Sequence, residues 1–181
     1  MRDTGLRYAM LDRPLILTGF MGAGKSCVGR LLAARLTCPF IDLDAEVVAM
    51  AGRSINEIFA KDGEAAFRAL ESTCLEHALH RGGAVIATGG GAVIAEANRA
   101  LMRASGVVVN LTAPFDLIME RLSGARDRPL YAGDDPAKRV KLLMEQREQF
   151  YSDADIRIDT DGKSVEDVAA VILGYLRGLA A

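Results

Sequence analysis

The stretch Gly19-Phe-Met-Gly-Ala-Gly-Lys25-Ser26 matches the pattern GxxxxGK[ST] and decides the fold class of this chain. It follows an apolar segment at 15–18 and precedes a helical apolar pattern at 28–36, which is the strand, loop and helix setting that the pattern requires. Glycines let such a loop turn its N–H groups inward around phosphate oxygens, and the next helix points its positive end at them. A glycine-rich turn without a ligand is the alternative, but all fixed positions and both flanks are present. We therefore predict a P-loop.

Two side chains of this loop carry chemistry. Lys25 can neutralise the β and γ phosphates of ATP, and the Ser26 hydroxyl can ligate Mg²⁺. The sequence contains no Asn-Lys-x-Asp segment of the kind that guanine-specific switch GTPases use. A kinase that uses ATP is therefore favoured over a regulatory GTPase.

Short apolar segments alternate with longer helical patterns along the chain, which is typical of a parallel sheet flanked by helices. Helix starts are marked by a capping box at Ser54-Ile-Asn-Glu57, by Asp135-Pro136 and by Ser164. We predict an α/β fold with five strands, at 15–18, 40–43, 84–88, 107–111 and 156–158.

Composition limits the remaining possibilities. The chain has 181 residues, of which 50% are hydrophobic, so we expect one compact domain. Its formal net charge of −2 gives no general attraction for nucleic acid or an anionic membrane. Three cysteines without a CxxC pair suit a reducing compartment, and no apolar run is long enough to span a bilayer. We expect a cytoplasmic protein that binds neither nucleic acid nor membranes.

Acidic residues for the metal shell are expected near the P-loop. The third predicted strand ends in Thr88-Gly-Gly-Gly91 and offers none, so Asp42 and Asp44 at the end of the second strand are the best candidates. If that strand persists, alternate residues share a side and both carboxylates face one way. The alternative is an acidic strand end that caps the helix starting near Ala45.

Charged and glycine residues could hold a second substrate. Arg68, held by Glu71 at i, i+3, would present a fixed fork to a carboxylate or phosphate, although spacing alone favours a surface ion pair. The glycines of 89–91 could let a ligand lie against the backbone or could form a simple tight turn. Arg147 and Tyr151, one helical turn apart, could supply a second arginine and its support, or form a solvated face.

The segment 123–135 is rich in glycine, proline and charge, which is typical of an exposed and mobile loop. Its arginines, Arg126 and Arg128, could fold over ATP and cancel charge on the transferring phosphoryl group. Solubility is the alternative explanation for two arginines in a loop.

Together these residues resemble the shikimate kinase family, and the match runs from about Pro14 onward. Its ordered features are the P-loop, Asp42-Leu-Asp44, Gly52-Arg-Ser-Ile-x-Glu-Ile-Phe59, Phe67-Arg-x-x-Glu71, Gly89-Gly-Gly91, Arg128-Pro-Leu130 and Arg147-x-x-x-Tyr151. The chain departs from the family pattern at Cys27, where threonine is common, at Tyr131, and over residues 1–13, which match nothing.

The resemblance implies a nucleoside-monophosphate-kinase-like fold and transfer of the γ-phosphate of ATP to the 3-hydroxyl of shikimate, a step towards chorismate and the aromatic amino acids. Residues 14–181 would form one kinase domain, with a substrate-binding subregion near 44–72 and a lid near 123–135. Residues 1–13 would be an extension, with its order left open. The cofactors would be ATP and Mg²⁺, and we expect a monomer.

The resemblance also assigns roles by motif. Asp44 would bind the ring hydroxyls of shikimate, Arg68 and Arg147 its carboxylate, and Glu71 would position Arg68. Catalytic roles would fall to Lys25, Asp44 and Arg128, and the metal would be held by Ser26, with Asp42 acting through its water shell. The nucleotide would contact Gly22, Ala23, Gly24, Lys25, Ser26, Cys27, Arg128 and Lys163, and the acceptor ring would contact Gly89, Gly90 and Gly91. Rival hypotheses are another small-acceptor kinase, for gluconate or a nucleotide, and a nucleotide sensor without chemistry.

Overall fold

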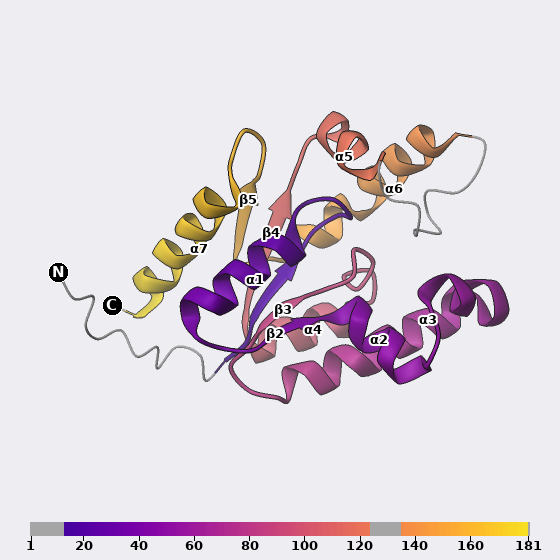
Figure 1. Ribbon diagram of the computed structural model, residues 1–181, viewed down its shortest axis with the longest axis horizontal. Coiled ribbons are helices and arrows are strands. Elements are labelled where there is room, and N and C mark those ends of the chain that lie inside the picture. The colour runs from indigo at the N-terminus through magenta and orange to yellow at the C-terminus, as the bar shows by residue number, and fades with distance from the viewer. Residues whose placement is uncertain (1–12, 124–134, 181) are drawn as a thin grey trace.

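Five parallel strands form a single sheet in the order β2-β3-β1-β4-β5 (Figure 1). The computed structural model describes residues 13–123 and 135–180. All five predicted strands are confirmed, and no strand end differs from the prediction by more than one residue. They are β1 (Leu15–Thr18), β2 (Phe40–Asp42), β3 (Val85–Ala87), β4 (Val107–Thr112) and β5 (Ile156–Asp159).

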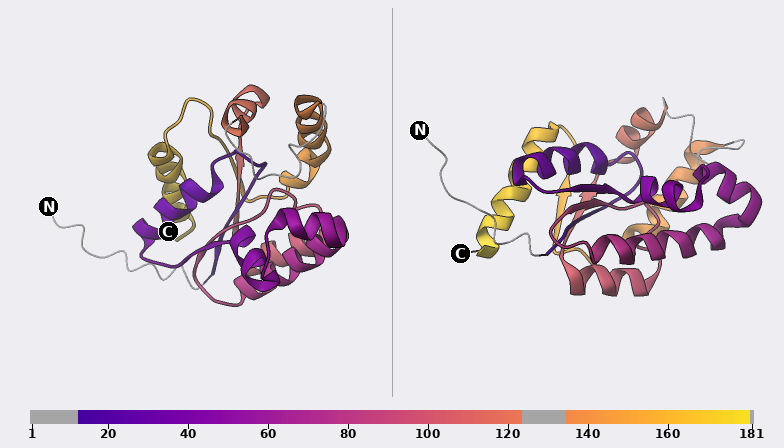
Figure 2. Two further views of the ribbon diagram at one scale, coloured as in Figure 1. Left: turned by 45° about the vertical axis from the view of Figure 1, so that its right-hand side comes forward. Right: turned by 60° about the horizontal axis from the view of Figure 1, so that its bottom comes forward.

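Helices cover both faces of this sheet. One face carries α1 and α7, which pack against each other, and the opposite face carries α3 and α4 (Figure 2). The helices are α1 (Lys25–Leu36), α2 (Leu43–Ala51), α3 (Ile55–Leu79), α4 (Glu96–Ser105), α5 (Phe115–Leu122), α6 (Pro136–Tyr151) and α7 (Val165–Ala180). Because both faces are covered, the central strands are mostly apolar, and Leu15, Ile16 and Leu17 of β1 are buried.

The predicted helix caps are confirmed. Ser54 and Glu57 form a reciprocal capping box, in which the Ser54 N–H donates to Glu57 Oε2 at 2.9 Å and the Glu57 N–H to Ser54 Oγ at 3.3 Å. Asp135 Oδ1 accepts from the Lys138 N–H at 3.0 Å at the start of α6. The capped helix at Ser54 continues through α3, which is interrupted only at Gly63, where φ is 82°.

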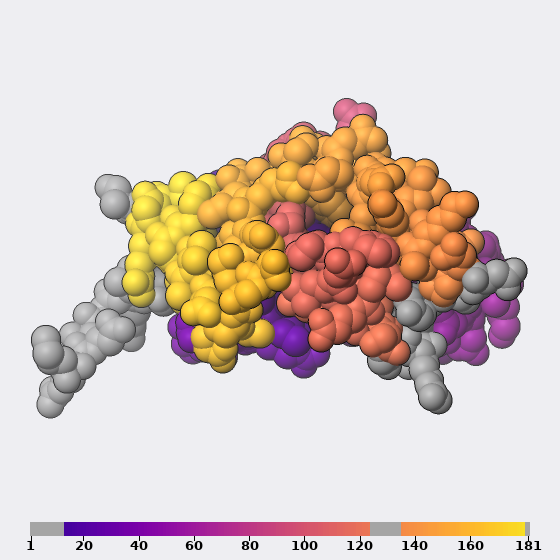
Figure 3. Space-filling view, turned by 90° about the horizontal axis from the view of Figure 1, so that it is seen from above, coloured from indigo at the N-terminus to yellow at the C-terminus, as the bar shows by residue number. Residues whose placement is uncertain are grey.

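The carboxyl ends of the strands gather the segments that the sequence singled out. Because β2, β3 and β1 are neighbours, the residues that follow them meet at one edge of the sheet, where open α/β folds bind ligands. Figure 3 looks down on this end, where α5 (salmon) lies between α6 (orange) and the segment from β5 into α7 (yellow).

Several expectations fall outside the described residues. They concern Arg126, Arg128 and nearly all of the predicted lid, together with all of the N-terminal extension except Arg13. Within the described ranges, no helix combines the length and the apolar character needed to cross a bilayer.

Candidate active site

The P-loop connects β1 to α1, and its glycines adopt backbone angles that other residues rarely reach. Gly24, directly before α1, has φ of 96°. The Lys25 side chain is 8% exposed and folds back over the loop, where its ammonium donates to the carbonyls of Gly19 and Phe20 at 2.8 and 2.9 Å. The loop therefore holds a buried positive charge beside the N-terminus of α1, which is a setting that favours phosphate.

Ser26 and Asp42 lie side by side on neighbouring elements. The Ser26 hydroxyl donates to Asp42 Oδ2 at 2.8 Å, and Asp42 Oδ1 accepts from the Asp44 N–H at 3.2 Å. Asp42 is the N-cap of α2, so the strand does not persist and the predicted alternation along it is wrong. Both carboxylates nevertheless line one cavity, because α2 begins at once and its first turn keeps Asp44 beside Asp42. Asp42 therefore both caps α2 and lines the cavity.

These two side chains fit a magnesium site of the kind found with bound nucleotides. A hydroxyl and a carboxylate are hard oxygen donors, and they are already oriented toward each other at the rim of the P-loop. Mg²⁺ in such sites retains waters and shares its shell with phosphate oxygens, so one direct protein ligand and one carboxylate behind a water are sufficient.

A cavity of about 350 Å³ opens over the P-loop. Residues predicted to bind the nucleotide, the metal or the acceptor form most of its wall: Gly22, Gly24, Lys25, Ser26, Cys27, Asp42, Asp44 and Gly90. Ala23, by contrast, is buried and Lys163 is exposed, and neither side chain lines this cavity.

Three further residues of the cavity wall were missed by sequence reasoning, namely Thr88, Arg121 and Val165. Arg121 lies in the last turn of α5 and donates to the Gly22 carbonyl at 2.8 Å. The available signal was its place on α5, a short helix that begins just beyond the carboxyl end of β4, at the edge of the sheet where open α/β folds bind ligands.

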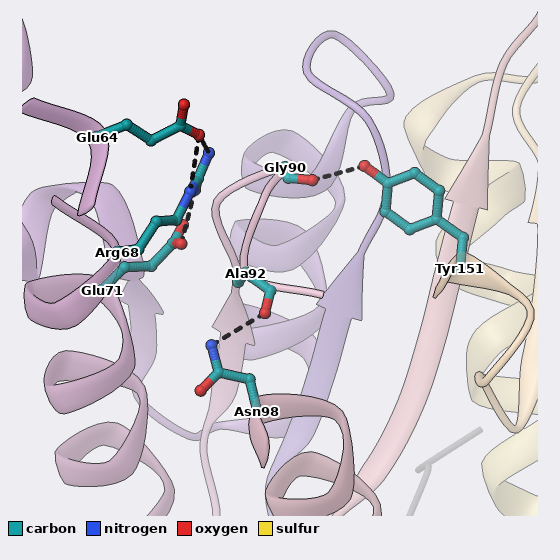
Figure 4. A network of polar contacts seen from close by, with 7 residues as sticks. All are labelled: Glu64, Arg68, Glu71, Gly90, Ala92, Asn98 and Tyr151. Carbon is teal, nitrogen blue, oxygen red and sulfur yellow. Dashed lines mark hydrogen bonds and ion pairs between the residues drawn. The ribbon is translucent and has the colours of Figure 1, made fainter. Parts of the chain in front are cut away.

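The acceptor side of the site contains an ion pair on α3. Arg68 donates to Glu71 Oε2 at 2.7 Å and to Glu64 Oε1 at 3.0 Å (Figure 4). Glu71 is only 1% exposed, so the surface ion pair that spacing favoured is wrong for this carboxylate. The guanidinium is instead fixed between one buried and one exposed acid, as a rigid fork for an anion.

Burial changes the acidity of Glu71. Desolvation raises the pKa of its carboxyl above the ordinary range, Arg68 opposes this, and the nearby Asp44 carboxylate adds to the rise. Burial alone would lower the pKa of Arg68, but Glu71 and Glu64 outweigh it and raise that pKa. The two rises are compatible. Arg68 has two carboxylates beside it, which favour its charged form, whereas Glu71 has the like charge of Asp44 nearby, which disfavours its charged form. The second oxygen of Glu71, Oε1, has no hydrogen-bond partner among the described residues.

The triple glycine after β3 makes room for these side chains. A β-carbon at Gly89 would lie 2.9 Å from Asp44 Oδ1 and still closer to Glu71 Oε1, and one at Gly91 would overlap the guanidinium of Arg68. Because these two positions have no side chain, the protein's own charged groups can pack against the backbone there. Gly90 alone lines the cavity, as predicted for a ligand that lies on the backbone.

Arg147 and Tyr151 on α6 are buried, at 3% and 5% exposure, so the solvated helix face is wrong for this pair. Arg147 lies 5.8 Å from the ring centroid of Phe20, and its Nη1 has no hydrogen-bond partner among the described residues. The Tyr151 hydroxyl donates to the Gly90 carbonyl at 2.6 Å (Figure 4). A buried guanidinium with an unpaired N–H fits an anionic ligand, because such a group is costly to leave unsatisfied.

Several known proteins are similar to this chain, and they point to one family. The family model for shikimate kinase matches residues 21–177. The shikimate kinase of Geobacter metallireducens is 55% identical over 92% of this chain and 93% of its own length. The structure of the Acinetobacter baumannii shikimate kinase in complex with shikimate superposes with a TM-score of 0.90 at 35% identity, over 93% of this chain and 95% of that one.

A gluconokinase from Sinorhizobium meliloti has a TM-score of 0.60 at 17% identity over 94% of both chains, which shows a shared fold alone. The family model and the curated relatives both extend over most of the chain. The chain belongs to the shikimate kinase family.

Proposed function

We propose that the cavity over the P-loop is where this chain performs the reaction of its family, the transfer of the γ-phosphoryl group of ATP to the 3-hydroxyl of shikimate. The observation that carries the assignment of the site is the position of Asp44. Its carboxylate lines the cavity that contains Lys25 and Ser26, and together with Glu71 it fills the space that a side chain at position 89 would occupy. Asp44 therefore lies between the phosphate end and the acceptor end.

The acceptor is held at its carboxylate. Arg68 comes from α3 and Arg147 from α6, on opposite sides of the triple glycine. The positive charges of both guanidiniums favour the ionised form of the buried Glu71 carboxylate and so oppose the rise in its pKa. Two fixed guanidiniums suit a planar carboxylate, and they would orient the ring so that one hydroxyl faces Asp44. Shikimate has the required carboxylate and ring hydroxyls.

Transfer itself needs little covalent participation by the protein. The acceptor oxygen forms a bond to the γ-phosphorus while the bond from that phosphorus to the β–γ bridging oxygen breaks, and ADP leaves. Asp44 orients the attacking hydroxyl and accepts its proton, and Lys25 neutralises charge on the phosphates. Magnesium would be held by Ser26 directly and by Asp42 through water, and it would add positive charge between the β and γ phosphates. Arg128 would reach the same phosphates from the segment 123–135.

Acceptor choice is the test of this function. ADP release, measured by a coupled assay, is compared for shikimate, gluconate and nucleoside monophosphates at saturating MgATP. We expect turnover on shikimate to exceed the others by orders of magnitude, because only shikimate combines a carboxylate for the two arginines with a ring hydroxyl for Asp44. Preferred turnover of gluconate or of a nucleotide would overturn the proposal. The monomeric state and the cytoplasmic location remain predictions.

A further inference from the structure

Tyr151 occupies the end of α6 and connects two parts of the acceptor site. Its hydroxyl donates to the Gly90 carbonyl at 2.6 Å, and its side chain is buried. One helical turn earlier on α6 lies Arg147, whose positive charge opposes the rise in the pKa of the same hydroxyl. The tyrosine therefore contacts the triple glycine and lies on the same helix as an arginine of the acceptor site.

The direction of this hydrogen bond is fixed by chemistry. A carbonyl can only accept, so the single O–H of Tyr151 is committed to Gly90. Burial raises the pKa of Tyr151 well above its usual range, with Arg147 opposing the rise, so the hydroxyl keeps its proton throughout the neutral range.

The hydroxyl also orients the peptide that follows. No peptide bond in the described chain is cis, so the Gly91 N–H points opposite to the Gly90 carbonyl. That carbonyl faces Tyr151, with Arg68 on the other side of the triple glycine (Figure 4). The guanidinium of Arg68 lies directly against Gly91. Within 13–123 and 135–180, no hydrogen bond uses the Gly91 N–H, so it is available on the side where we place the acceptor carboxylate.

We propose that Tyr151 is a positioning residue for the acceptor: its hydroxyl holds the Gly90–Gly91 peptide in the orientation in which the Gly91 N–H meets the acceptor carboxylate. This inference rests on the proposed function and extends it. Tyr151 does not line the cavity over the P-loop, so its contribution is to recognition of the carboxylate and not to the chemical step.

The test compares Tyr151→Phe with the wild type on shikimate and on its methyl ester, in which the carboxylate charge is absent. Loss of the hydrogen bond to the Gly90 carbonyl should raise KM for shikimate roughly fivefold to tenfold, with KM for ATP and kcat changed less than about twofold. The ester gains little from the positioned donors, so the ratio of kcat/KM for shikimate to that for the ester should fall about fivefold or more. Tyr175→Phe, which removes a hydroxyl from α7 outside the cavity wall, is the matched control and should leave the ratio unchanged.

The ratio is decisive because both acceptors are measured on one preparation, so partial loss of folded enzyme cancels from it. A lower ratio in Tyr151→Phe alone supports the inference. An unchanged ratio in active Tyr151→Phe, or an equal loss for ATP and shikimate, would overturn the inference while the proposed function stands. Failure of the wild type to phosphorylate shikimate would overturn both.

Discussion

Replacing Glu71 by glutamine should make the protein more stable and a poorer enzyme. The carboxylate is 1% exposed, one of its oxygens lacks a partner among the described residues, and Asp44 lies nearby with the same charge. Burying such a group unsatisfied costs about 1–3 kcal/mol. Glutamine retains the shape and can still accept from Arg68, which also keeps Glu64 at 3.0 Å. Weakening of the charge-assisted bond costs about 1 kcal/mol, so we expect a net gain of about 1 kcal/mol in the free energy of unfolding at pH 8.

The gain should depend on pH in a defined direction. The folded pKa of Glu71 is raised from its ordinary value of 4.5, so the native state binds this proton more tightly than the unfolded chain does. The contribution of Glu71 to stability is therefore fully present below about pH 4.5 and is lost as pH rises through the raised pKa. Glutamine does not titrate, so its advantage over the wild type should grow between pH 5 and 8.

Denaturant unfolding of the wild type, Glu71→Gln and Glu64→Gln across this pH range measures the effect. Glu64 pairs with the same arginine but is 57% exposed, so its replacement should change stability by less than about 0.5 kcal/mol at any pH. Kinetic assays of Glu71→Gln should show KM for shikimate raised about fivefold to tenfold, because Arg68 loses its buried anion. A Glu71→Gln protein that is less stable than the wild type at pH 8, or a difference that does not vary with pH, would refute the reasoning.

Other substitutions separate the proposed roles. Lys25→Ala should lower kcat by about 10² to 10³ while circular dichroism stays native, and unchanged turnover would contradict its role at the phosphates. Arg147→Ala should raise KM for shikimate at least about tenfold and leave KM for ATP within about twofold. A large loss of ATP affinity would instead show that Arg147 does not bind the acceptor carboxylate. Arg128→Ala should lower kcat more than it raises KM for shikimate, and a pure binding defect would place it elsewhere. Asp44→Asn should lower kcat by roughly 10² to 10⁴ with nucleotide binding retained. Asp42→Asn should raise the Mg²⁺ concentration needed for the half-maximal rate. If both variants show the same Mg²⁺ dependence, the two carboxylates do not have distinct roles.

The sequence by itself determined the features that depend on neighbours along the chain. The P-loop was identified because its glycines, Lys25 and Ser26 form a contiguous pattern between a strand and a helix. The caps at Ser54, Asp135 and Ser164 were predicted for the same reason, since a cap involves residues only three positions apart. Strand positions followed from short apolar segments, and only their ends shifted, as at Asp42, where the side chain caps α2 and ends the strand.

The tertiary structure decided which charged residues belong to the site. Spacing placed Arg68 beside Glu71, and Arg147 beside Tyr151, but helical spacing is the same for a solvated face and a covered one. Glu71 is buried because the glycines at 89 and 91, which follow β3 and are distant in sequence from α3, leave space for it and for Arg68. Arg121 reaches the Gly22 carbonyl across 99 positions of sequence. Burial, and with it the raised pKa of Glu71 and the unpaired N–H of Arg147, arises only when segments distant in sequence exclude water together, because desolvation depends on the whole surroundings of a group and not on its neighbours along the chain.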